Sequence, residues 1–133
     1  MKIVTIIARI LLGIIFLIFG LNGFFNFLHG TLPGGMAGTF LRVLMHSHYV
    51  YFVSGIQVIA GFILLIDRYV PLAVVLLGAE VANILIFHLT MELADIPLAI
   101  VIAILWAIVA WRVRANIAPL FAAKAECEAR QKL

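Results

Sequence analysis

Apolar residues run through this chain in four long stretches, which are separated by short polar or Gly- and Pro-containing segments. The stretches cover residues 3–28, 49–66, 69–91 and 96–113. A helix needs about 20 residues to cross about 30 Å of hydrocarbon, and each stretch is close to that length. The pattern predicts an all-α integral membrane protein, a bundle of four transmembrane helices in which residues 1–133 form a single domain.

Two further segments have patterns of their own. Residues 28–48 begin with the helix breakers Gly30 and Pro33, and then show apolar residues three or four positions apart from Met36 to Leu44. This predicts a short interfacial helix between the first and second transmembrane helices. Residues 115–133 are polar enough to leave the membrane, and they predict a short cytoplasmic helix after Pro119.

Composition and charge indicate how the bundle sits in the membrane. Hydrophobic residues make up 66% of the chain and charged residues 11%, and the mean hydropathy is +1.25, as in membrane proteins. With four spans, eight basic residues fall on one side and only Arg42 on the other, so the positive-inside rule predicts that both termini are cytoplasmic. The net charge of +3 serves anchoring in the lipid bilayer, and no nucleic-acid motif accompanies it.

One acidic residue lies at bilayer depth. Glu80 is midway along the third stretch, where an ionisable side chain is costly and indicates a functional site or a charged partner. The first interpretation is a structural ion pair of Glu80 with Arg9, which enters the first stretch from the cytoplasmic side. The second is that Glu80 is a proton acceptor or ligand contact, with Glu80 and His88 as the candidate catalytic residues. In the third, Glu80 is simply protonated.

A smooth face is predicted on the first helix. Gly13, Gly20 and Gly23 lie on the same face as Arg9, because their separations are close to whole helical turns. Such a face lets another helix approach closely, either within the bundle or in a homo-oligomer.

A layer of neutral polar residues is predicted near the outer surface. Asn22 and Asn26 recur along the first helix, Ser54 and Gln57 share a face of the second, and Asn83 lies on the third. Hydrogen bonding between helices is one interpretation. The other is a polar pocket for a small amphipathic molecule with a carbonyl or hydroxyl group. The candidate ligand-binding residues are Asn22, Asn26, Gln57, Glu80, Asn83 and His88.

Candidate metal-binding and redox-active side chains are few. Cys127 is the only cysteine, which excludes direct dithiol chemistry because that chemistry needs two thiols. All four histidines, namely His29, His46, His48 and His88, fall on the predicted outer side. No H-x-x-x-H spacing occurs, and His46 and His48 do not share a helix face. The histidines are therefore weak metal candidates, and neither a metal nor haem is expected.

Four segments, in this order and spacing, resemble the DoxX family of small four-helix bacterial membrane proteins. They are GLNGFFNFL (20–28), YFVSGIQVIAGFILLIDRYVPLAVVLL (51–77), VANILIFHL (81–89) and WRVRANIAPLF (111–121). The resemblance implies a location in the bacterial cytoplasmic membrane. It also implies a link to redox systems, since some members are small subunits of a thiosulfate:quinone oxidoreductase and others belong to membrane complexes that handle oxidative stress.

The chain departs from the family pattern at charged positions. Family members often have an acid where Gln57 stands and a basic residue where Asn22 stands, whereas Glu80 falls where they are apolar or have Pro. The residues that match the family pattern are Arg9, Asn83 and His88. A charged pair between the first two spans is therefore replaced here by two amides, and the acid lies on the third span.

Three classes of function follow from the sequence. The leading prediction is a non-catalytic subunit or binding module that positions a quinone- or lipid-like molecule for a redox-protein partner. The second is a membrane enzyme or carrier that uses Glu80 and His88 on a small substrate. The third is a structural protein that forms a homo-oligomer through its glycine faces.

Overall fold

The computed structural model describes residues 2–125, and its regular elements there are all helical. The elements are α1 (Lys2–Phe25), α2 (Gly35–His46), α3 (Tyr49–Ile66), α4 (Val70–Thr90), η1 (Leu93–Asp95), α5 (Ile96–Arg112), α6 (Arg114–Ile117) and η2 (Ala118–Phe121). Four helical segments in the described residues are long and apolar enough to cross a membrane: α1, α3, α4, and η1 together with α5. The predicted four-helix membrane fold is confirmed.

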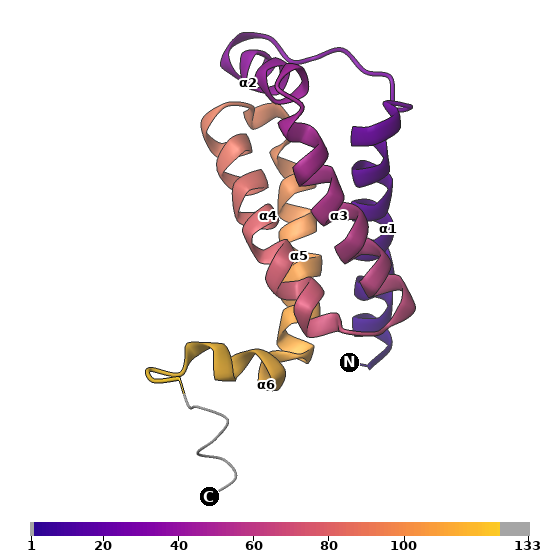
Figure 1. Ribbon diagram of the computed structural model, residues 1–133, viewed down its shortest axis with the longest axis vertical. Helices are drawn as coiled ribbons and strands as arrows, with labels where there is room; N and C mark the ends of the chain where they lie inside the picture. Colours follow the sequence, from indigo (N-terminus) through magenta and orange to yellow (C-terminus); the bar gives the residue numbers. More distant parts are fainter. Residues whose placement is uncertain (1, 126–133) are drawn as a thin grey trace, which may run out of the picture.

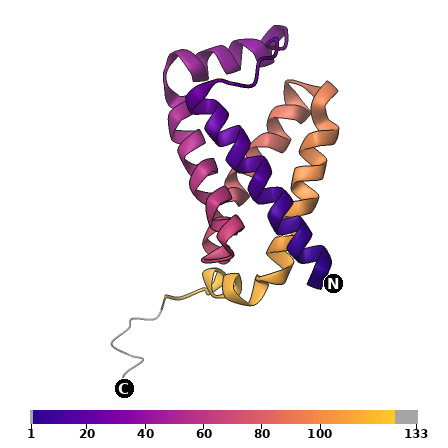
Figure 2. The same cartoon turned by 90° about the vertical axis from the view of Figure 1, so that its right-hand side faces the viewer.

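The four long helices form a ring of antiparallel neighbours (Figures 1 and 2). Helix α1 packs against α3, α3 against α4, α4 against α5, and α5 closes the ring on α1. Short connections place α3 beside α4 and α4 beside α5, whereas α1 and α3 are joined through the longer segment that contains α2. The predicted short helix between the first two spans is α2, which lies across one end of the bundle, and α6 lies at the other end near the start of α1 (Figure 1). We refer to these as the α2 end and the α6 end.

The first transmembrane helix ends at Phe25, three residues before the predicted limit at Leu28. Asn26 takes the left-handed conformation, with φ 48°, and its N–H donates to the carbonyl oxygen of Asn22 at 2.7 Å. The side-chain Oδ1 of Asn22 then accepts the N–H of Leu28, also at 2.7 Å. Asparagine tolerates this conformation better than most residues, so the two amides end the helix here.

The chain after α5 continues in short helical turns. Helix α6 and the 3₁₀ helix η2 cover residues 114–121, which confirms a short C-terminal helix and places it earlier than the predicted start after Pro119. The last part of the predicted tail, residues 126–133 with Cys127, lies outside the described residues.

Helices α1 and α3 approach each other at backbone distance along the predicted glycine face. A Cβ added at Gly61 would lie 2.7 Å from the backbone nitrogen of Leu17 and 2.9 Å from the carbonyl oxygen of Gly13. One added at Gly20 would lie 2.8 Å from Val58, and one at Gly23 would collide with Ser54. The glycine face of α1 is therefore confirmed as a close-packing surface, and its partner is α3 of the same chain.

The opposite side of the ring is held by α4 and α5. The indole Nε1 of Trp106 donates to the backbone carbonyl of Val74 at 2.9 Å, which links the two helices by a side-chain hydrogen bond. Between the helices lies a core of fully buried side chains. Its largest members are Phe16, Leu12, Leu64, Leu77, Val74 and Val109.

We expect Gly61→Ala to lower the free energy of unfolding by about 1–3 kcal/mol, because the added methyl group would meet the backbone of α1 and push the helices apart. The matched control is Gly55→Ala on the same helix, where no other group lies within 4 Å of the added Cβ. There the alanine should leave stability unchanged or raise it, since alanine favours helix more than glycine does. Thermal unfolding in detergent, followed by circular dichroism, measures both variants. An equal response of the two would contradict backbone contact between α1 and α3.

Candidate ligand-binding site

A cavity of about 320 Å³ lies between α1 and α3 near the α2 end. Asn22 and Asn26 line it from α1 and the residue after it, and Ser54 and Gln57 line it from α3. Met45 of α2 also contributes to its wall. The structure therefore brings together three of the candidate ligand-binding residues, Asn22, Asn26 and Gln57, at one cavity.

The hydrogen bonds of the two inner amides decide what they can offer a ligand. The Oδ1 of Asn22 accepts the N–H of Leu28, which leaves its NH₂ group to donate. The Nε2 of Gln57 donates to Oε2 of Glu80 at 3.4 Å, which leaves its carbonyl oxygen to accept. Neutral amides of this kind can hydrogen-bond a carbonyl or hydroxyl group, and they do not supply a proton.

An apolar hollow adjoins this cavity on the outside of the bundle. Phe24 and Tyr51 line both, and their rings stack with centroids 5.6 Å apart at an interplanar angle of 2°. The hollow has a volume of about 590 Å³ and is completed by Leu21, Phe25 and Val58. The sequence pattern did not predict this pair of aromatic rings. The available signal was the position of Phe24 and Tyr51 beside Asn22 and Ser54 on two helices that pack together.

The three candidate residues on α4 are placed differently from the amides. Glu80 is half-buried and meets the site only through its hydrogen bond with Gln57. Asn83 donates to the carbonyl oxygen of Ala79 at 3.0 Å, and Nδ1 of His88 lies 2.7 Å from the carbonyl oxygen of Ile84. Neither Asn83 nor His88 lines the cavity, whose walls come from α1, the residue after it, α2 and α3.

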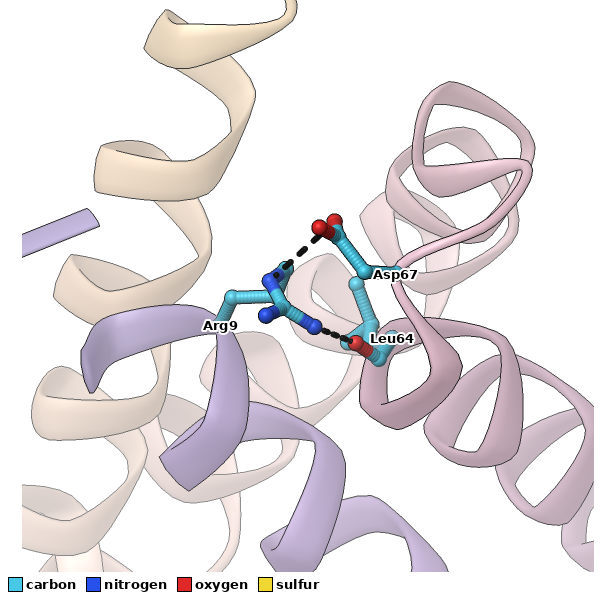
Figure 3. A network of polar contacts seen from close by, with 3 residues as sticks. All are labelled: Arg9, Leu64 and Asp67. Atoms are coloured by element: carbon cyan, nitrogen blue, oxygen red, sulfur yellow. Dashed lines mark hydrogen bonds and ion pairs between the residues drawn. The ribbon is translucent and has the colours of Figure 1, made fainter. Parts of the chain in front are cut away.

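Arg9 forms an ion pair with Asp67, and the predicted ion pair between Arg9 and Glu80 is wrong. Its Nε lies 3.3 Å from Oδ1 of Asp67, and an NH group donates to the carbonyl oxygen of Leu64 (Figure 3). Helix α1 packs on α3 and α5, so α4 lies across the ring from it. Glu80 is also about ten residues into α4, roughly 15 Å along the helix from the α6 end. Asp67 ends α3 at the depth of Arg9.

The weak metal candidates do not form a ligand set in the described part of the chain. Within residues 2–125, no three His, Cys, Asp or Glu side chains are grouped so that they could hold a metal ion. The Nδ1 atom of His46 lies 2.9 Å from the carbonyl oxygen of Arg42, and the ring of His48 stacks on the ring of Tyr51 with centroids 5.5 Å apart. His29 is exposed in the connection after α1.

Comparison of the chain with family models, with curated proteins and with solved structures finds no match in any of the three. The fold by itself defines a small multi-span helical membrane protein.

We expect Arg9→Leu to lower the free energy of unfolding by about 1–3 kcal/mol, because the variant loses both the ion pair and the hydrogen bond to the α3 backbone. Asp67→Asn should cost less than about 1 kcal/mol, since its side chain is 65% exposed and an exposed ion pair contributes little. Asparagine also tolerates the left-handed backbone of this position, where φ is 56°. Thermal unfolding in detergent compares the two, and a larger loss for Asp67→Asn would contradict this ranking.

Proposed function

We propose that this chain is a non-catalytic binding module that holds a quinone- or lipid-like molecule for a membrane redox system. The observation that supports it most directly is the amide-lined cavity between α1 and α3, with an apolar hollow beside it. A cavity of about 320 Å³ is within the usual size range of small-molecule sites. Ligands with a polar ring and an apolar tail fit such a pair of spaces.

A quinone matches the chemistry of the two spaces. Its ring carries carbonyl oxygens that could accept a hydrogen bond from the NH₂ group of Asn22, and the reduced form carries hydroxyl groups that could donate to Gln57. Its tail would lie against the stacked rings of Phe24 and Tyr51. The resemblance to the DoxX family, some of whose members serve quinone-linked oxidation, supports the same class of ligand.

The departures from the DoxX pattern also favour a neutral ligand. Asn22 and Gln57 stand where family members often carry a basic and an acidic residue, and both line the same cavity here. Amides keep the hydrogen-bonding capacity of such a pair without the cost of charge in a membrane. A neutral carbonyl compound is therefore a better match to this cavity than an ion.

The orientation and the partners are part of the proposal. We place the α6 end in the cytoplasm of a bacterial cell, with the chain in the cytoplasmic membrane, because eight of the nine basic residues belong to that end or the tail. A redox-protein partner could dock on the tail. The glycine faces of α1 and α3 pack on each other, so a homo-oligomer would have to use other surfaces than those glycines.

Gln57→Leu should weaken binding of a short-chain quinol such as decylubiquinol by about three- to tenfold, because the carbonyl oxygen that would accept from a quinol hydroxyl is lost. Asn83→Leu is the matched control, since it removes an amide from the same end of the membrane that does not line the cavity. Isothermal titration of the purified protein in detergent measures both affinities. Equal affinities of the two variants and the wild type would count against this cavity as the quinone site.

The hydrogen bond between Gln57 and Glu80 favours one alternative, an enzyme or carrier in which Glu80 handles a proton for the ligand. In our leading proposal Glu80 is only a positioning residue for Gln57. Glu80→Gln then keeps an oxygen that accepts from Gln57 and should bind decylubiquinol within about threefold of the wild type, whereas Glu80→Leu should bind it as weakly as Gln57→Leu does.

Quinone reduction by an added electron donor distinguishes the two functions. In the alternative, Glu80→Gln would bind the quinone normally and lose its turnover. If the leading proposal is correct, the rate of quinone reduction is the same with Glu80→Gln as with the wild type, because the carboxyl group of Glu80 takes no part in it.

A further inference from the structure

A second pair of spaces lies at the α6 end, far from the amide-lined cavity. The first is a cavity of about 450 Å³ bounded by α1, α5 and the turn between α3 and α4, which we call the basic cavity. Its charged lining residues are Lys2, Arg9, Asp67 and Arg112. The second has a volume of about 770 Å³ and runs between α1 and α5; we call it the apolar groove. Lys2, Thr5 and Arg112 line both, so the two spaces adjoin each other.

The basic cavity has an excess of positive charge. The carboxylate of Asp67 lies 3.3 Å from Arg9 and offsets its charge. Lys2 and Arg112 then leave the cavity with a net charge of two positive. Asn116 adds an amide that can donate a hydrogen bond. This combination suits an anion with several oxygen acceptors, such as a phosphate group.

The apolar groove indicates what kind of phosphate would bind. Its wall between Arg112 and the bundle centre contains Ile104, Ala107 and Ile108, which extend about 12 Å into the membrane by helical rise. Trp111 stands at its cytoplasmic end, with the guanidinium of Arg114 4.5 Å from the ring centroid. Aromatic and basic residues at this depth are typical of the boundary between lipid headgroups and acyl chains. A soluble phosphate compound would leave this groove empty.

We propose that the α6 end of the bundle binds one anionic phospholipid, with its phosphate in the basic cavity and an acyl chain in the apolar groove. Basic pockets between transmembrane helices on the cytoplasmic side are known to suit such headgroups. The lipid would bridge the start of α1 and the end of α5, the two helices that close the ring. The proposal does not depend on the quinone site, because the residues lining the two sites do not overlap.

The test uses the full chain, purified in detergent and given equal amounts of phosphatidylglycerol and phosphatidylcholine, with bound lipids counted by native mass spectrometry. We expect phosphatidylglycerol to be retained preferentially. The Lys2→Gln/Arg112→Gln variant should bind it about ten- to thirtyfold more weakly, as the loss of two cations at a membrane surface predicts. The matched control is Arg42→Gln/Arg68→Gln, which loses the same charge outside both spaces and should bind like the wild type.

A third variant tests the groove without changing any charge. Ala107→Leu fills part of the groove and should weaken phosphatidylglycerol binding. In a separate competition experiment on the wild type, glycerol phosphate should displace the bound lipid only when it is present in large excess. Equal retention of both lipids by the wild type would overturn the proposal. So would an equal loss in the control variant, which would indicate net charge alone, or displacement by glycerol phosphate at the concentration of the lipid, which would indicate a soluble anion.

Discussion

The close approach of α1 and α3 is the constraint on which the rest of the bundle depends. Between two helices in lipid there is no hydrophobic driving force, so association relies on van der Waals contact and on hydrogen bonds. Glycine at positions 13, 20, 23 and 61 brings the two backbones together. The same contact shapes the candidate site, since the missing side chain of Gly23 is what makes room for Ser54, and both residues line the amide-lined cavity. The candidate site thus lies at the end of a tightly packed pair of helices.

The polar side chains of α1 and α3 differ between the two ends of the bundle. At the α6 end, where the headgroup region is near, the charge of Arg9 is met by the carboxylate of Asp67 and the backbone carbonyl of Leu64. Towards the α2 end the polar side chains of α1 and α3 are neutral: Asn22, Ser54 and Gln57. Neutral amides cost less than ions away from water, and their hydrogen bonds need partners rather than counter-charges.

The sequence predicted the fold well and the contacts less well, for physical reasons. Hydropathy gives the length of each span, because the hydrocarbon thickness fixes how many apolar residues a helix needs. It does not give the order of helices around the ring, and so it could not show that α1 and α4 lie across from each other. The expected Arg9–Glu80 pair fails for this reason. The early end of α1 depends on Asn26 adopting a left-handed backbone, which only its local hydrogen bonds reveal.

For the candidate site, the residue types were predictable but their grouping was only partly so. Helical spacing places Gln57 on the face of α3 that carries Gly61, but it turns Asn22 about 180° away from Gly13 on α1, so spacing alone does not predict that the two amides line one cavity. Asn83 and His88 lie at the depth of the predicted outer polar layer, but their side chains hydrogen-bond to backbone carbonyls of their own helix. Helical spacing does not predict which hydrogen-bond partner a polar side chain takes. Glu80 does not line the cavity itself, but it accepts a hydrogen bond from Gln57, which does. An acid on α4 can therefore act on a ligand between α1 and α3 only through that amide, which makes Gln57 the residue on which any role of Glu80 depends.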